Sequence, residues 1–263
     1  MGDPTAQVIA VLGLGEAGGR IAADLVSAGA YVRGYDPGTV STPEGVARAG
    51  DPASAVAGTG LTLSVNSAMA ALDVAAACLP ALSEVTTYAD LNTASPELKC
   101  EIAALVGGTG ARFADVALLG PVPKLGLRAP VLASGDGARA FADLLEPLGM
   151  PVNVISGEPG DAAAMKLVRS VFMKGLAAAV VESMQAAEQA GHADWLAGEI
   201  AALVGLPLFE RALEGSRKHA ARRVDEMAAA RDLLVELGVE PRIASASAEQ
   251  LAELAAHERR VPS

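Results

Sequence analysis

A glycine-rich turn near the N-terminus constrains the fold of this chain more than any other feature. An apolar run over residues 7–12 leads into Gly13-Leu14-Gly15-Glu16-Ala17-Gly18, and a helix-like segment follows over residues 18–28. The spacing G-x-G-x-x-G between a strand and a helix suits a pyrophosphate, because Gly13 permits a tight turn and Gly15 leaves the backbone uncovered. Gly18 lets the helix pack closely on the strand, and the helix N-terminus offers N–H donors and a positive dipole end. The segment predicts a dinucleotide-binding βαβ unit.

A carboxylate follows the next predicted strand, residues 31–35. Asp36 lies about 20 residues after the glycine turn, where an acidic residue binds the ribose hydroxyls of NAD in this kind of unit. It would also repel the 2′-phosphate of NADP, and no Lys or Arg follows it until Arg48. The pattern favours NAD as the cofactor, with NADP possible. The alternative is that Asp36 only starts a turn before Pro37.

The chain divides into two parts with different patterns. Up to about Gly157, strand-like and helix-like segments alternate, which predicts a mostly parallel sheet with helices on both faces. From Asp161 onward almost all signals are helical. We therefore expect an α/β fold, in which a doubly wound Rossmann domain over residues 1–158 is joined by a long helix to an all-helical substrate and dimerisation domain over residues 159–263.

The expected elements follow from apolar periodicity and from Gly and Pro at the joints. After residues 7–12 and 31–35, the expected strands are 61–65, 85–91, 112–117 and 130–134. The expected helices are 18–28, 96–106, 138–148, 161–189, 194–203, 207–213, 216–237 and 247–260. Gly238 is expected to end the helix over 216–237, and Pro241 to prevent its resumption.

Charge, cysteine content and hydropathy exclude several classes of protein. The net charge of −11 argues against a non-specific nucleic-acid surface, although a local site for an anion remains possible. Cys78 and Cys100 form no C-x-x-C pair and accompany no His/Cys cluster, so we expect two buried, reduced thiols and no metal site. We expect no signal peptide, no membrane span and no membrane partner, and hence a cytoplasmic location.

Three further segments match a known pattern. They are Leu91-Asn92-Thr93-Ala94-Ser95-Pro96, Asp115-Val116-Ala117-Leu118-Leu119-Gly120-Pro121 and the helical segment from Gly160 to Ser170. Together with residues 8–36 they resemble the β-hydroxyacid dehydrogenases, the group that contains 3-hydroxyisobutyrate and 6-phosphogluconate dehydrogenases. Residues 119–123, 166–175 and 222–227 resemble a bacterial branch of that superfamily.

The resemblance implies roles for individual residues. Lys166 falls on the catalytic lysine, and Ser170, one helical turn later, takes the place of the usual Asn. The set implied for the substrate is Leu119, Gly120, Pro121 and Lys174; the set implied for the cofactor is Gly13, Leu14, Gly15, Glu16, Ala17, Gly18, Asp36, Val65, Asn66 and Thr93. Leu119 stands where the family has a Ser that touches the substrate carboxylate, which a Leu cannot bind.

The resemblance implies a nicotinamide-dependent oxidoreductase that acts on a small hydroxy or oxo compound. The Lys166 ammonium would protonate the developing alkoxide in reduction, and its neutral amine would take the proton back in oxidation. Leu118 and Leu119 indicate a less acidic or more apolar substrate than those of the named dehydrogenases. The alternative is that Lys166 has no catalytic role and is a solvent-exposed lysine on a helix, as most lysines are.

For several other residues the sequence allows two roles. Lys174 binds an anionic substrate or extends from a packed helix into solvent, and Arg169 has the same two possibilities. Asn66 approaches the cofactor or caps the next helix. Three further residues, His219, Arg222 and Arg223, could contact a cleft or a partner subunit. A charged face exposed to solvent is the more ordinary role for them.

Two other functions remain open. An imine reductase would keep the cofactor site and the long helix, but its relatives commonly replace the lysine that Lys166 matches. A cofactor-binding sensor without turnover is the alternative from another class. Because the helical part is small and buries little by itself, we also expect a homodimer that pairs through the C-terminal helices.

Overall fold

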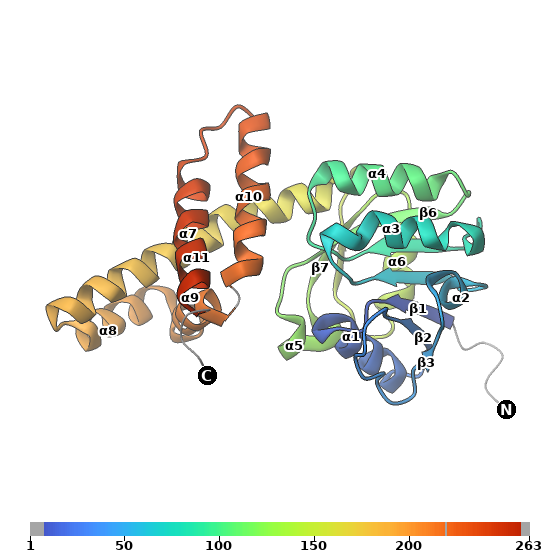
Figure 1. The fold of residues 1–263 in the computed structure, drawn as a ribbon, viewed down its shortest axis with the longest axis horizontal. Coiled ribbons are helices and arrows are strands. Elements are labelled where there is room, and N and C mark those ends of the chain that lie inside the picture. The colour runs from blue at the N-terminus through green and yellow to red at the C-terminus, as the bar shows by residue number, and fades with distance from the viewer. Residues whose placement is uncertain (1–7, 219, 259–263) are drawn as a thin grey trace. The chain divides into compact units, whose positions relative to one another are not determined.

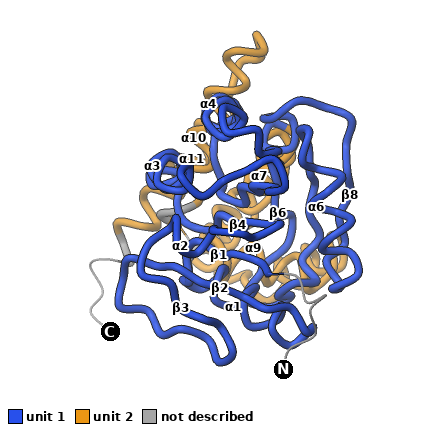
Figure 2. Tube along the Cα trace, turned by 90° about the vertical axis from the view of Figure 1, so that its right-hand side faces the viewer, with its two compact units in different colours: residues 1–164 blue, residues 165–263 orange. Residues whose placement is uncertain are grey.

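The computed structural model describes residues 8–218 and 220–258 (Figure 1). The chain forms two compact units, residues 1–164 and residues 165–263, coloured separately in Figure 2. The first unit holds the sheet and the second is helical. No helix in the described ranges is long and apolar enough to cross a membrane.

The first unit is built on one eight-stranded sheet. Its strands are β1 (Val8–Leu12), β2 (Tyr31–Tyr35), β3 (Ala47–Arg48), β4 (Leu61–Ser64), β5 (Thr87–Asp90), β6 (Arg112–Leu118), β7 (Val131–Ser134) and β8 (Val152–Val154). Their order is β3-β2-β1-β4-β5-β6-β7-β8. All neighbouring pairs are parallel except β6 and β7. The order reverses between β1 and β4, which is the switch point where doubly wound sheets bind ligands.

Helices cover both faces of this sheet. They are α1 (Glu16–Ser27), α2 (Pro52–Val56), α3 (Ala68–Cys78), α4 (Pro96–Gly107), α5 (Val122–Leu125) and α6 (Ala138–Leu145). Alternate residues of β1 enter two different cores, as the period of a strand requires. Ile9 and Val11 join the core that α1 and α6 cover, whereas Ala10 and Leu12 join the core under α3 and α4.

The sequence-based expectations differ from this unit in three respects. The short strands β3 and β8 and the helices α2, α3 and α5 were not expected. A strand of two or three residues is too short for a periodic pattern, and α3 is apolar on nearly all sides. The prediction of two buried thiols was wrong for one of them, because Cys78 is buried but Cys100 is exposed on α4.

The second unit contains most of α7 (Asp161–Ala190), a helix of 30 residues that begins in the first unit. The others are α8 (Ala193–Val204), α9 (Leu206–Lys218), α10 (Ala220–Glu236) and α11 (Arg242–Glu258). One apolar core joins α7 to α10 and α11, and a second joins α7 to α8 and α9.

Three expected helix boundaries in this unit were wrong. The helix expected over 207–213 runs on to Lys218. Ser216 does not begin the helix expected over 216–237 but lies in α9, where its hydroxyl donates to the Ala212 carbonyl at 2.6 Å. The last helix begins at Arg242 rather than Ser247, directly after Pro241. Proline stops a helix that precedes it but suits the start of a new one, because the first turn needs no N–H from it.

Candidate functional site

The glycine turn forms an open cradle at the N-terminus of α1. Gly13 has φ +100°, and a side chain on it would overlap the Val65 carbonyl oxygen. A Cβ on Gly18 would overlap the Gly13 carbonyl, whereas a Cβ on Gly15 would meet nothing within 4 Å. Gly15 is the N-cap of α1 and provides no side-chain hydrogen bond to the first turn. Open space above backbone N–H groups fits a pyrophosphate, so these residues suit the dinucleotide that the motif predicts.

Asp36 lies at the end of β2, against this turn. Its Oδ2 accepts the N–H of Leu14 at 2.8 Å, and its Oδ1 accepts the N–H of Gly38 at 2.8 Å. The bond to Gly38 is the local turn that the alternative interpretation expected, and the bond to Leu14 joins the same carboxylate to the glycine turn. Each carboxylate oxygen can accept a further hydrogen bond, so ribose hydroxyls can still be bound there.

Two asparagine side chains meet at the carboxyl ends of β4 and β5. The amides of Asn66 and Asn92 donate to the same hydroxyl, Ser64 Oγ, at 3.0 and 3.1 Å. The alternative role of Asn66 as a helix cap is wrong, because Ser67 caps α3 by accepting from the Ala70 N–H. Thr93 follows on the exposed surface.

The predicted substrate loop directly follows β6. The Leu119 side chain packs on a small apolar cluster with Ala117, Leu132 and Ala162. Its N–H donates to the Pro130 carbonyl at 2.9 Å. A Cβ on Gly120 would lie 2.8 Å from Leu125 and 3.1 Å from Pro130, so a side chain there would require Leu125 to move. Pro121 is the exposed N-cap of α5. The structure therefore gives Leu119 a packing role.

Lys99, Asp90 and Asp115 form a buried ionic network in the first unit. Lys99, which is 1 % exposed, donates to the Asp90 carbonyl at 2.7 Å, and its Nζ lies 3.2 Å from Asp115 Oδ1 and 3.6 Å from Asp90 Oδ1. Both carboxylates are fully buried. Burial raises the pKa of Asp90, although the Lys99 charge and the hydrogen bonds from Asn92 oppose the shift. One cation thus stands between two buried carboxyl groups.

The same network anchors the start of α7. Asp115 Oδ2 accepts the N–H groups of Gly160 at 3.1 Å and of Ala163 at 2.9 Å. Ser134, which pairs with Asp115 across β6 and β7, accepts the N–H of Ala162 at 3.1 Å. Two neighbouring strand side chains therefore satisfy the first turn of the helix that carries Lys166. Sequence reasoning missed this network, because Lys99 lies between Glu97 and Glu101 and looks like an ordinary lysine on a helix surface.

In the second unit, the polar face of α7 meets a carboxylate from α10. Glu226 Oε1 accepts a hydrogen bond from the Ser170 hydroxyl at 2.5 Å and lies 2.9 Å from Lys174 Nζ. The side chains of Lys174 and Glu226 are 17 % and 11 % exposed. Burial by itself raises the pKa of Glu226, but the charges of Lys174 and Lys166 and both hydrogen bonds outweigh it, so the pKa lies below its ordinary value.

This arrangement brings together three residues that the sequence singled out and one that it did not. Ser170 and Lys174 share the Glu226 carboxylate, and Lys166 is half-buried one turn before Ser170. Glu226 was missed as a site residue, and the only signal for it was its place in the segment 222–227. Arg169 is exposed, and Arg223 donates to Ser216 Oγ at 2.9 Å. His219 and the side chain of Arg222 lie outside the described residues.

Two sequence families match the chain. The NAD-binding domain of 6-phosphogluconate dehydrogenase matches residues 8–155, and a domain of unknown function (DUF1932) matches residues 187–254. An uncharacterised 28.5 kDa protein from Methanothermus fervidus is 29% identical over 143 residues, 53% of this chain. The match spans about half of that curated relative, 55% of its length.

Solved structures with the same fold cover almost the whole chain. A conserved hypothetical protein from Sinorhizobium meliloti is 27% identical, with a TM-score of 0.75 over 99% of this chain and 92% of the other. The 3-hydroxyisobutyrate dehydrogenase of Mycobacterium tuberculosis has a TM-score of 0.80 at 22% identity, over 98% and 100%. A reductive aminase from Aspergillus terreus, in complex with NADPH, has a TM-score of 0.68 at 19% identity, over 97% and 95%.

Proposed function

Since the chain belongs to the family of the NAD-binding domain of 6-phosphogluconate dehydrogenase, in the β-hydroxyacid dehydrogenase superfamily, we propose that it transfers hydride between a nicotinamide cofactor and a small hydroxy or oxo compound. The observation that carries this proposal is the polar face of α7. There Lys166 is followed by Ser170 and Lys174, which share the Glu226 carboxylate. A lysine whose surroundings include a partly buried carboxylate can hold and release a proton during a reaction.

The residues of the chain divide the chemistry between them. When bound, the nicotinamide cofactor supplies or accepts the hydride. The glycine turn and the N-terminus of α1 bind its pyrophosphate, and Asp36 accepts hydrogen bonds from the adenine ribose. In reduction Lys166 Nζ gives a proton to the carbonyl oxygen as the carbon receives the hydride, and solvent then returns a proton to the amine. In oxidation the amine takes the hydroxyl proton.

The substrate carries no carboxylate that needs a dedicated anchor. Leu119 holds the position that touches a carboxylate in the family, and its side chain packs on apolar neighbours. Lys174 is committed to Glu226 at 2.9 Å, which disfavours its role as the receptor of an anionic substrate. These two contacts support an uncharged aldehyde, ketone or alcohol as the substrate.

The carboxylate of Asp36, directly after β2, favours NAD as the cofactor. The Asp36 carboxylate binds the Leu14 N–H of the glycine turn, and a carboxylate beside such a turn favours the 2′-hydroxyl of NAD and repels a 2′-phosphate. Binding of NADH and NADPH can be compared by nicotinamide fluorescence. Equal affinity, or tighter binding of NADPH, would overturn this preference.

The test of the reaction uses the loss of nicotinamide absorbance with panels of uncharged carbonyl compounds, 3-oxo acids and imines. We expect turnover of the uncharged carbonyl compounds, and a loss of about 10²–10⁴-fold in kcat for Lys166→Ala with NADH affinity kept. Lys124→Ala is the matched control, since Lys124 is an exposed lysine on α5. Normal turnover by Lys166→Ala would remove Lys166 from the mechanism, and turnover confined to imines would establish an imine reductase. Binding of NADH without any turnover would favour a sensor.

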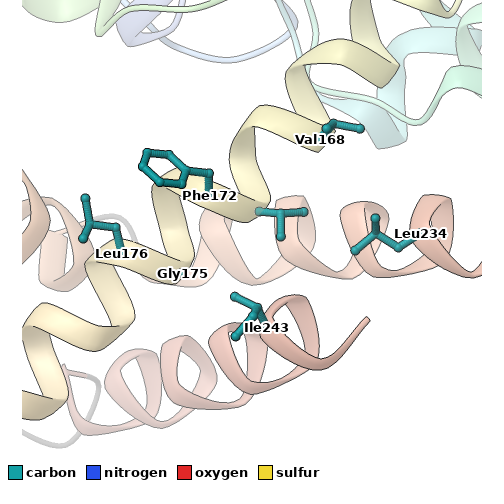
Figure 3. A pocket seen from close by; sticks show the side chains of 7 residues that line it. Val168, Phe172, Gly175, Leu176, Leu234 and Ile243 are labelled. Carbon is teal, nitrogen blue, oxygen red and sulfur yellow. The ribbon is translucent and has the colours of Figure 1, made fainter. Parts of the chain in front are cut away.

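The second unit also offers a surface for a homodimer. An apolar groove of about 480 Å³ lies between α7, α10 and α11 (Figure 3). Gly175 lets α11 approach α7 here, because a Cβ on it would lie 2.6 Å from Ile243. Val168, Phe172 and Ile243 line the groove and are 49 %, 69 % and 57 % exposed. Such contiguous apolar exposure supports pairing through the C-terminal helices.

Light scattering tests the dimer. We expect a dimer at micromolar concentration and a monomer for Phe172→Asp, whereas Met69→Asp, at an exposed position on α3, should stay dimeric. A monomeric wild-type protein would contradict the proposal.

Both cysteines are free, which is usual in a reducing compartment and supports a cytoplasmic location.

A further inference from the structure

One side chain of β3 donates four hydrogen bonds to the loop after Asp36. This loop, residues 36–46, connects β2 to β3 at the edge of the sheet (Figure 1). The carbonyl groups of Asp36, Gly38 and Val40 are all bound by the guanidinium of Arg48, the second residue of β3.

The four terminal N–H groups of Arg48 can account for all of these bonds. Nη1 donates to the Val40 carbonyl at 2.8 Å and to the Thr42 hydroxyl at 3.0 Å. Nη2 donates to the carbonyls of Asp36 and Gly38, each at 2.8 Å. A guanidinium has five N–H donors in a rigid planar fork, so only the Nε donor is not used in this set.

These bonds connect Arg48 to the cradle for the dinucleotide. The residue whose carbonyl Arg48 binds, Asp36, places one carboxylate oxygen on the Leu14 N–H in the glycine turn and the other on the Gly38 N–H. The backbone of Gly38 is thus held from both sides, by its N–H on Asp36 and by its carbonyl on Arg48. The position of the Asp36 carboxylate therefore depends on the loop that Arg48 fixes.

We propose that Arg48 is a specificity-determining residue of the cofactor site, which fixes the 36–46 loop so that Asp36 selects the 2′-hydroxyl of NAD. The inference rests on the proposed preference for NAD and deepens it. Arg48 is the first cation after Asp36 in the sequence, and so the obvious candidate to bind the 2′-phosphate of NADP. Its terminal donors are instead committed to the loop, and turning them toward a phosphate would break four hydrogen bonds at once.

The test measures the affinity of purified variants for NADH, NADPH and ADP-ribose, by nicotinamide fluorescence and, for ADP-ribose, by competition. Arg48→Met removes the fork, and Arg48→Lys keeps the charge without the planar fork. If the loop holds Asp36 in place for only about a tenth of the time without Arg48, NADH binding weakens about tenfold. We expect this loss for both variants, and an equal loss for ADP-ribose, because the loop adjoins the adenine ribose.

Arg33→Met is the matched control. Arg33 lies on β2 and also donates to two carbonyl groups, those of Ser54 at 3.0 Å and Ala57 at 2.5 Å, but these lie on and after α2 rather than in the 36–46 loop. We expect its NADH affinity to stay within about twofold of the wild type. Hydrogen exchange of the cofactor-free protein adds an independent measurement: amides in residues 36–46 should exchange faster in both Arg48 variants, with the rest of the sheet unchanged.

Three results would overturn the inference. One is NADH affinity in Arg48→Met equal to that of the wild type. Another is full recovery by Arg48→Lys, which would show that charge alone is needed. The third is a selective loss of NADPH binding in Arg48→Met, which would make Arg48 a phosphate ligand. These results concern binding, so they are distinguishable from failure of the proposed hydride transfer, in which NADH would bind normally but no substrate would react.

Discussion

Asp115 accepts the backbone N–H of Ala163 at 2.9 Å, across 48 residues of sequence. A buried strand residue thereby caps the helix that carries Lys166, and Lys99 holds the same carboxylate from the other side at 3.2 Å. The start of α7 is fixed to the sheet by side chains as well as by the chain connection.

Removal of the Asp115 carboxylate should destabilise the first unit strongly. Asp115→Ala leaves Lys99 with one buried partner and deprives Gly160 and Ala163 of their acceptor. Breaking a buried ion pair on one side costs about 3–5 kcal/mol, which urea unfolding would detect. Asp143→Ala is the control: its pair with Arg139 is exposed, so we expect a change of about 0.5 kcal/mol or less. Equal effects of the two substitutions would contradict the anchoring role.

A side chain should affect cofactor binding at Gly15 but folding at Gly13. Gly15→Val should fold with a stability within about 1 kcal/mol of the wild type, because a Cβ there meets nothing within 4 Å. It should lose NADH affinity by more than about tenfold, since the new side chain occupies the space above the helix N-terminus. Gly13→Val should fail to fold normally, because φ is +100° and the Val65 carbonyl is in the way. Normal NADH binding by Gly15→Val would place the pyrophosphate elsewhere.

Glu226 should make stability depend on pH in the acid range. Its folded-state pKa is lowered, so its contribution is fully present above the unfolded pKa of about 4.3 and is lost as pH falls through the lower folded value. We expect Glu226→Gln to be less stable than the wild type by about 2 kcal/mol at pH 7, with a smaller deficit below about pH 4. Urea unfolding at both pH values measures this. Glu236→Gln, at an exposed position on the same helix, should show neither effect, and a deficit independent of pH would contradict the ion pair.

The two cysteines should differ in reactivity toward a thiol reagent such as a soluble aromatic disulfide. Burial, with the nearby charge of Asp51, raises the pKa of Cys78 to about 12, so this thiol should react only after unfolding. Cys100 is exposed and should react in the native protein, faster as the pH rises, because partial burial and nearby carboxylates raise its pKa too. Cys100→Ser should abolish the native reaction. A second thiol reacting in the folded protein would show that the core around Cys78 opens.

The sequence by itself determined the features that depend on neighbours along the chain. The glycine turn, the strand before it and the helix after it were predicted because their spacing is local, and β2 was predicted at its observed bounds. The long helix was predicted from an apolar segment without interior proline, to within a residue of the observed end of α7 at Ala190. The family was indicated by residues 8–36 and the three later motifs, and the match over residues 8–155 confirms it.

Only the tertiary structure decided which distant side chains share a charge or a hydrogen bond. Glu226 meets Ser170 across 56 residues, Asp115 meets Ala163 across 48, and Arg48 turns back onto the carbonyls of its own loop. No periodic pattern encodes such pairs, because each partner looks like an ordinary charged residue in its own segment. They become a site only when burial removes water and leaves each charged group with the partners that the fold has placed beside it.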